Sequence, residues 1–200
     1  LPVPRMGVVF AGWVLFGSVS QIAGTALLLR TMAERNFAVG VAYSKTEVVQ
    51  VAFFSLILLG DTLDAQGTLA VACGTLGVLL LAPANRERPL RSLIEGFRSR
   101  SALLGLACGA CMALSSVGFR GATHALASSS LLVSAAVTLV VSQSLQTLLL
   151  GGWLGMRDRP VVLRTLRAWR PSLFAGLAGA AASAGWFTAF AMKPVTSSPS

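Results

Sequence analysis

The stretch FAVGVAYSKTEVVQVAFFSLILLG, Phe37 to Gly60, is a long apolar run with two charged residues near its middle, Lys45 and Glu47. A helix that crosses a bilayer needs about 20 mainly apolar residues, and this stretch is long enough. A charged side chain at the bilayer centre costs at least about 2.5–3.5 kcal/mol on insertion scales. We therefore predict a membrane-spanning helix whose charges face a bundle interior or a water-filled cavity.

The composition of the whole chain also favours a membrane protein. Apolar residues make up 54% of the 200 residues and charged residues only 12%, and the mean hydropathy is +0.74. Soluble domains contain about 45–50% apolar and about 25% charged residues. A soluble chain of this size cannot bury so much apolar surface, whereas lipid can cover it.

Six apolar segments, separated by short polar ones, are predicted to span the membrane. Because lipid offers no partner to an unbonded backbone group, we expect helices; a barrel would show alternating segments of about ten residues. The predicted fold is an all-α integral membrane protein with transmembrane helices at Gly7–Leu29, Phe37–Leu59, Gln66–Pro83, Ser101–Phe119, Ser130–Gly155 and Pro171–Met192.

The basic residues are distributed as in a membrane protein, so the net charge of +9 does not indicate nucleic-acid binding. Loops 30–36, 84–100 and 156–170, which alternation places on one side, carry twelve basic residues, and the other side carries three. Since cytoplasmic loops are enriched in Lys and Arg, we place these loops in the cytoplasm and the first residues outside.

Two of the basic loops have apolar residues at helical spacing. They are PLRSLIEGFRSR at 89–100 and PVVLRTLRAWR at 160–170. Either these segments lie as short helices on anionic lipid headgroups or they are solvated basic loops.

A weak internal repeat is present. VFAGWVLFGSVSQIAGTALLLRTM starts at Val9 and LFAGLAGAAASAGWFTAFAMKPV at Leu173, and both have F-A-G near the start and a basic residue near the end. Secondary transporters are often built from such repeats. If these copies are real, we expect further helices beyond both ends of the chain.

The stretch from Phe37 to Ala82 resembles the end of the first half of an EamA-type transporter of the drug/metabolite transporter superfamily. The resemblance is carried by Leu-Leu-Gly-Asp at 58–61, a short polar loop, and a Gly-interrupted helix ending GVLLL at 77–81. It implies a ten-helix inverted-repeat bundle in a bacterial inner membrane, of which the six spans are the third to eighth helices. Residues 1–85 would end one repeat, 86–100 form a linker, and 101–200 start the second.

The chain departs from the family pattern at two places. Asp61 stands where the family usually has Glu, and KTEVV replaces a mid-helix Pro in the fourth helix. Members are thought to keep both termini in the cytoplasm, which conflicts with the arginine distribution, and we follow the arginines of this chain.

The candidate site is one face of the Phe37–Leu59 helix. Tyr43, Glu47 and Gln50 share one face, at positions i, i+4 and i+7. Lys45 and Glu47 are two residues apart and point to well-separated sides of a regular helix, so they should not pair directly. We expect Glu47 to bind a cationic group or a proton and Tyr43 and Gln50 to donate hydrogen bonds. Lys45 would extend to the cytoplasmic interface or reach a substrate anion. The alternative is an internal charge that only fixes helix packing.

Other polar or aromatic residues are secondary candidates for the substrate path. Three of them are polar and either face the path or hold helices together at about 1 kcal/mol each, namely Gln21, Gln143 and Gln146. The fourth, Trp186, either lines the path or packs in the core or at an interface. His124 is expected in an exposed loop. Two G-x-x-x-G pairs, at 105–109 and 151–155, are typical of close helix crossings. Cys108 and Cys111 form C-x-x-C, which inside a span favours packing over redox chemistry.

The sequence contains no catalytic constellation, metal cluster or phosphate-binding loop, so we predict neither an enzyme nor a cofactor. A secondary transporter for small metabolites or drug-like compounds, working by alternating access and favouring efflux, is the first hypothesis. The alternative is a non-transporting membrane subunit. The expected partners are a small-molecule substrate, the bilayer with its anionic headgroups and, as a homodimer, a second copy of the chain.

Overall fold

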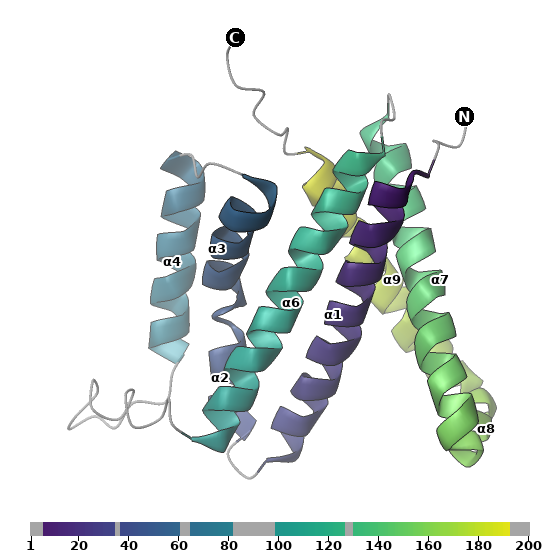
Figure 1. Ribbon diagram of the computed structural model, residues 1–200. Helices are drawn as coiled ribbons and strands as arrows, with labels where there is room; N and C mark the ends of the chain where they lie inside the picture. The colour runs from purple at the N-terminus through teal and green to yellow at the C-terminus, as the bar shows by residue number, and fades with distance from the viewer. Residues whose placement is uncertain (1–5, 35–36, 61–64, 82–98, 127–129, 193–200) are drawn as a thin grey trace. The chain divides into compact units, whose positions relative to one another are not determined.

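The computed structural model describes residues 6–34, 37–60, 65–81, 99–126 and 130–192, and nearly all of these residues are helical (Figure 1). The predicted all-helical fold is therefore confirmed for this part of the chain. In chain order the helices are α1 Val8–Ala33, α2 Phe37–Ser44, α3 Glu47–Leu59, α4 Ala65–Leu81, α6 Arg100–Ala125, α7 Leu131–Arg157, α8 Arg159–Arg167 and α9 Trp169–Met192.

Among the described residues, four helical segments are long and apolar enough to cross a membrane, and they indicate a multi-pass membrane protein. They are Val8–Ala33, Val39–Leu59, Arg100–Ala125 and Leu132–Arg157. The other two predicted spans are also helical, as α4 with 17 residues and α9 with 24. The full count of six spans stays a prediction.

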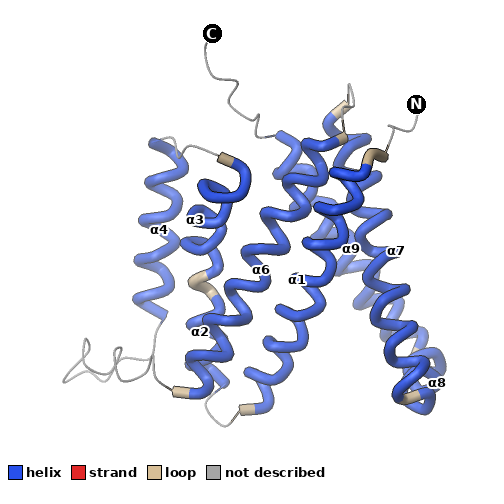
Figure 2. The backbone as a smooth tube through the Cα atoms, in the orientation of Figure 1, coloured by secondary structure: helices blue, strands red, loops and turns tan. Residues whose placement is uncertain are grey.

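The segment 37–59 differs from the single regular helix that its apolar length predicts. It consists of α2 and α3, separated by a turn at Lys45 and Thr46, and Figure 2 shows this turn as a loop between the two helices. The hydroxyl groups of Ser44 and Thr46 bond to nearby backbone carbonyls and compete with the helical hydrogen bonds at this turn.

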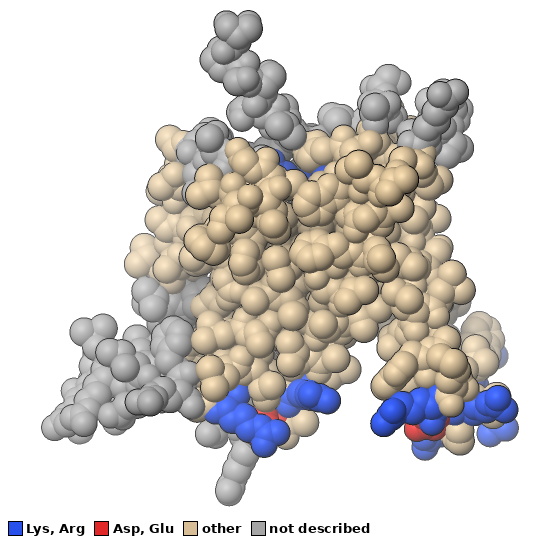
Figure 3. Space-filling view, in the orientation of Figure 1, with Lys and Arg blue, Asp and Glu red and all other residues tan. Residues whose placement is uncertain are grey.

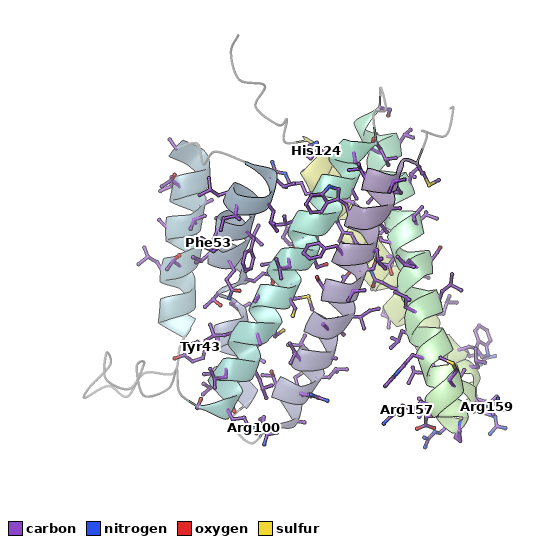
Figure 4. The ribbon with its side chains drawn as sticks, in the orientation of Figure 1. Tyr43, Phe53, Arg100, His124, Arg157 and Arg159 are labelled. Atoms are coloured by element: carbon purple, nitrogen blue, oxygen red, sulfur yellow. The ribbon has the colours of Figure 1, made fainter. Side chains whose placement is uncertain are left out.

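Helix α6 is longer than the predicted span Ser101–Phe119. It continues past Phe119 to Ala125, so His124, labelled in Figure 4, lies half-buried in its last turn and not in an exposed loop. The expectation for His124 was wrong because GATHA contains no helix-breaking residue except one glycine, which a tightly packed helix tolerates.

Contacts group the chain into two compact units, and α1 and α6 contribute to both. We call Ser20–Val117 the central unit, and Leu1–Val19 with Gly118–Ser200 the terminal unit. The predicted repeat boundary at 86–100 lies almost entirely outside the described residues.

The core of the terminal unit is built from aromatic and aliphatic side chains. Phe10 and Val14 of α1 are buried against Ala122 and Leu126, with α7 residues packed around them. A second cluster joins α6 to α9, where the rings of Phe119 and Phe187 lie 5.1 Å apart between centroids. α9 also packs along α7.

Several helices of the central unit approach one another closely at glycines. A Cβ atom on Gly105 of α6 would collide with the carbonyl group of Gly40 on α2, so the two backbones are in direct contact. At one end of the unit, Glu34 and Arg100 form an ion pair with Oε1 and Nε 3.3 Å apart (Arg100 is labelled in Figure 4). The end of α1 and the start of α6 therefore meet, as the alternation of helix directions requires.

Replacing Gly105 with Ala should lower the stability of the protein by about 1–3 kcal/mol, because the methyl group meets backbone that cannot move aside. The change can be measured by thermal unfolding of the purified protein in detergent micelles. The matched control is Gly151→Ala in the other G-x-x-x-G pair, where a Cβ meets nothing within 4 Å. That variant should be as stable as the parent or up to about 1 kcal/mol more stable. Equal effects of the two substitutions would contradict the assigned crossing.

Candidate functional site: a broken helix in the central unit

At the turn between α2 and α3, hydrogen bonds between residues three apart replace the regular α-helical bonds between residues four apart. The N–H groups of Lys45 and Thr46 donate to the carbonyls of Ala42 and Tyr43, three residues back, at 3.1 Å each. Bonds of this 3₁₀ type inside a helix often mark a functional hinge. The N–H groups of Val49 and Gln50 both donate to the carbonyl of Thr46, the N-cap residue of α3.

Hydroxyl groups on both sides of the turn bond to the backbone carbonyls. The Ser44 hydroxyl donates to the carbonyl of Val41 and the Thr46 hydroxyl donates to that of Tyr43, each at 2.7 Å. The Gln50 side-chain Nε2 donates to the Thr46 hydroxyl at 2.8 Å. Such local bonds compete with the helix ladder and explain why the apolar run breaks here.

Helix α6 covers the break with Gly109. A Cβ at this position would lie 2.8 Å from the Ser44 carbonyl oxygen and 3.3 Å from the Glu47 backbone nitrogen. Only a glycine lets α6 approach both half-helices so closely, and Gly105 allows the same close approach to α2 one turn earlier. The G-x-x-x-G pair at 105–109 is thus confirmed as a close crossing.

The opposite side of this part of α6 packs on α1. The buried Cys108 thiol donates to the carbonyl of Gly24 at 3.4 Å, and a Cβ on Gly24 would touch Cys111 and Met112 at 3.2 Å. Both cysteines are free thiols, which fits the packing role predicted for C-x-x-C. The break is therefore connected through α6 to α1.

Glu47 opens α3 and lies half-buried. A carboxylate in the first turn of a helix interacts favourably with the positive end of the helix dipole, typically by 0.3–1 kcal/mol. The exposed Lys45 is near enough for its charge to act on Glu47, but the two form no ion pair in the described structure. Within the described residues no hydrogen bond to the carboxylate is present.

The depth of Glu47 follows from the bounds of the span. Val39–Leu59 has its middle at Val49, and Glu47 lies two residues before it. At 1.5 Å per residue the carboxylate-bearing residue is within about 3 Å of the midpoint of the span. The break and the charge therefore coincide near the centre.

The structure joins only some of the predicted site residues. Tyr43 is buried and is linked to Gln50 through Thr46, while Gln21 is half-buried in the same unit. The remaining candidates belong to the terminal unit, and they are the exposed Gln143, the half-buried Gln146 and the exposed Trp186.

Thr46 and Gly109 are site residues that the sequence reasoning missed. The available signal for Thr46 was the Ser-Lys-Thr-Glu run, because hydroxyl residues inside an apolar helix offer the backbone alternative bonds. Nothing in the sequence marks which helix Gly109 would contact.

Comparison of the chain with models of protein families, with curated proteins and with solved structures gave no match.

Replacing Thr46 with Val, which has the same shape, should lower stability by about 1–3 kcal/mol because the Gln50 amide loses its acceptor. Thermal unfolding in micelles measures the loss. Thr147→Val is the control, since the exposed Thr147 hydroxyl bonds only to the carbonyl of Gln143 in its own helix, and its effect should stay within about 0.5 kcal/mol. If both variants lose the same stability, the Thr46 hydroxyl has no special role.

Proposed function

We propose that the protein is a secondary transporter of small solutes that works by alternating access, with the α2–α3 break as its central binding element. The observation that carries the proposal is the half-buried Glu47 at a helix break near the middle of a membrane-spanning segment. Secondary transporters commonly build their substrate and ion sites from discontinuous helices at the bilayer midplane.

The break provides groups of both polarities for a ligand. The N-terminus of α3 has the positive end of a helix dipole, and the C-terminus of α2 has the negative end with the Ser44 carbonyl. The Glu47 carboxylate adds a full negative charge, so a cationic group or a proton is the favoured ligand. Efflux of metabolites or drug-like amines is compatible with this chemistry.

The same element also suggests how access could alternate. The 3₁₀ bonds at Lys45 and Thr46 make the turn a natural hinge, because few backbone bonds must change there. The glycines of α6 bring its backbone into direct contact with both half-helices, so a change at the turn would be felt by α6. The resemblance of residues 37–82 to EamA-type transporters, which are ten-helix inverted-repeat bundles of a cell membrane, supports the same proposal.

The variant Glu47→Gln should abolish substrate transport or reduce it at least tenfold while expression and thermal stability remain normal, because the amide cannot hold a cation or a proton. Uptake and efflux by purified protein in liposomes, screened first with radiolabelled or fluorescent organic cations under an imposed pH gradient, provide the measurement.

The matched control is Glu34→Gln, which removes a carboxylate from the partly exposed ion pair with Arg100. Such surface pairs contribute only about 0–1 kcal/mol, so transport should persist. Full transport by Glu47→Gln would refute the role of Glu47. Absence of transport by the parent chain for every class of solute would favour a non-transporting membrane subunit.

A further inference from the structure

The segment from Arg157 to Arg170 in the terminal unit concentrates positive charge at one end of α7 and α9. It carries five arginines and one acidic residue, Asp158. The carboxylate of Asp158 is used locally, because its Oδ1 accepts the N–H of Val161 at 3.2 Å and caps α8. Figure 3 shows the basic side chains gathered here, and Figure 4 labels Arg157 and Arg159 at the junction of α7 and α8.

Helix α8 has separate apolar and basic sides. Val162, Leu163 and Leu166 are spaced so that they share one side, while Arg164 and Arg167 lie next to each other on another. The two leucines are more than half exposed, at 54% and 65%. A helix this short and charged cannot cross a membrane, and water is a poor solvent for its leucines. An amphipathic helix of this kind is suited to lie in the plane of a membrane interface.

Two tryptophan–arginine pairs flank α8, one near the end of α7 and one at the start of α9. The Arg157 guanidinium lies over the Trp153 ring at 5.8 Å, and that of Arg170 lies over Trp169 at 5.5 Å. Both tryptophan rings are about half exposed. Tryptophans are enriched at the headgroup level of membranes, so the pairs indicate independently where the interface crosses this unit.

We propose that α8 and its flanking tryptophan–arginine pairs form a binding site for the headgroup of an anionic phospholipid. Arg164 and Arg167 offer planar guanidinium groups that match a phosphodiester in two-point hydrogen bonding. Leu163 and Leu166 lie beside them, where the acyl chains of the same lipid would begin. A nucleic acid or a soluble polyphosphate would satisfy the arginines but leave the exposed leucines without an apolar partner.

The site does not depend on transport. It requires only that α7 lies in a membrane, as its length and composition indicate. The second basic segment expected to touch headgroups, at 89–100, lies almost entirely outside the described residues, so the proposal concerns α8 alone.

The test measures lipid binding to the purified full chain in neutral detergent micelles by native mass spectrometry and by thermal unfolding. Phosphatidylglycerol should bind at least tenfold more tightly than phosphatidylcholine and should raise the melting temperature, and added sodium chloride should weaken this preference. Arg164→Gln with Arg167→Gln should reduce phosphatidylglycerol affinity about 30-fold, as expected for two basic residues near an anionic surface. The melting temperature of this variant without lipid should stay unchanged, because both side chains are exposed.

The control variant, Arg30→Gln with Arg100→Gln, makes the same change in net charge in the central unit and should keep the affinity. If both double variants lost the same phosphatidylglycerol affinity, general charge attraction would explain the binding, and the proposed site would be wrong. Equal binding of the two lipids would also overturn it. Competition by millimolar glycerol phosphate, or binding lost with Arg164→Gln/Arg167→Gln but kept with Leu163→Ser/Leu166→Ser, would assign the arginines to a free phosphate instead of a lipid.

Discussion

A backbone inside a membrane must satisfy its own hydrogen-bonding groups, and this requirement governs the part of the protein around Lys45 and Thr46. The chain interrupts a membrane-spanning helix there, where an unbonded N–H or C=O group would cost several kcal/mol. The interruption is tolerated because the turn forms three-residue bonds, the hydroxyls of Ser44 and Thr46 bond to nearby carbonyls, and Gln50 completes the network. Other features of the central unit serve to protect this turn.

Protection comes from close backbone contact. Gly105 and Gly109 allow α6 to lie directly on the two half-helices, while Cys108 and Cys111 on its other side meet Gly24 of α1. This contact covers the polar turn on the α6 side. A half-buried carboxylate at such a break is costly for stability alone, which is why we connect it with solute binding.

The terminal unit follows a different design. Its core consists of interlocking side chains, with Phe10 and Val14 in one cluster and the Phe119–Phe187 pair in another. Its charged residues are concentrated at the arginine-rich end around α8, together with exposed leucines and tryptophan rings. We therefore propose separate roles for the polar groups within the span and for those at the arginine-rich end, the first in solute binding and the second in contact with headgroups.

The sequence alone determined the helical class and the positions of the apolar segments. The length of an apolar run is a local property, and it decides whether a segment can span the lipid as a helix. The sequence also marked Glu47 as a charge inside an apolar segment, while the face shared with Tyr43 and Gln50 stays a prediction. It did not determine that the helix breaks, since that depends on competition between side-chain and backbone bonds at Thr46. The two G-x-x-x-G pairs are indistinguishable as sequence, yet only Gly105–Gly109 meets another backbone, while Gly151 and Gly155 face open space. Which glycine is needed was decided by the helix that packs against it, and only the tertiary structure contains that information.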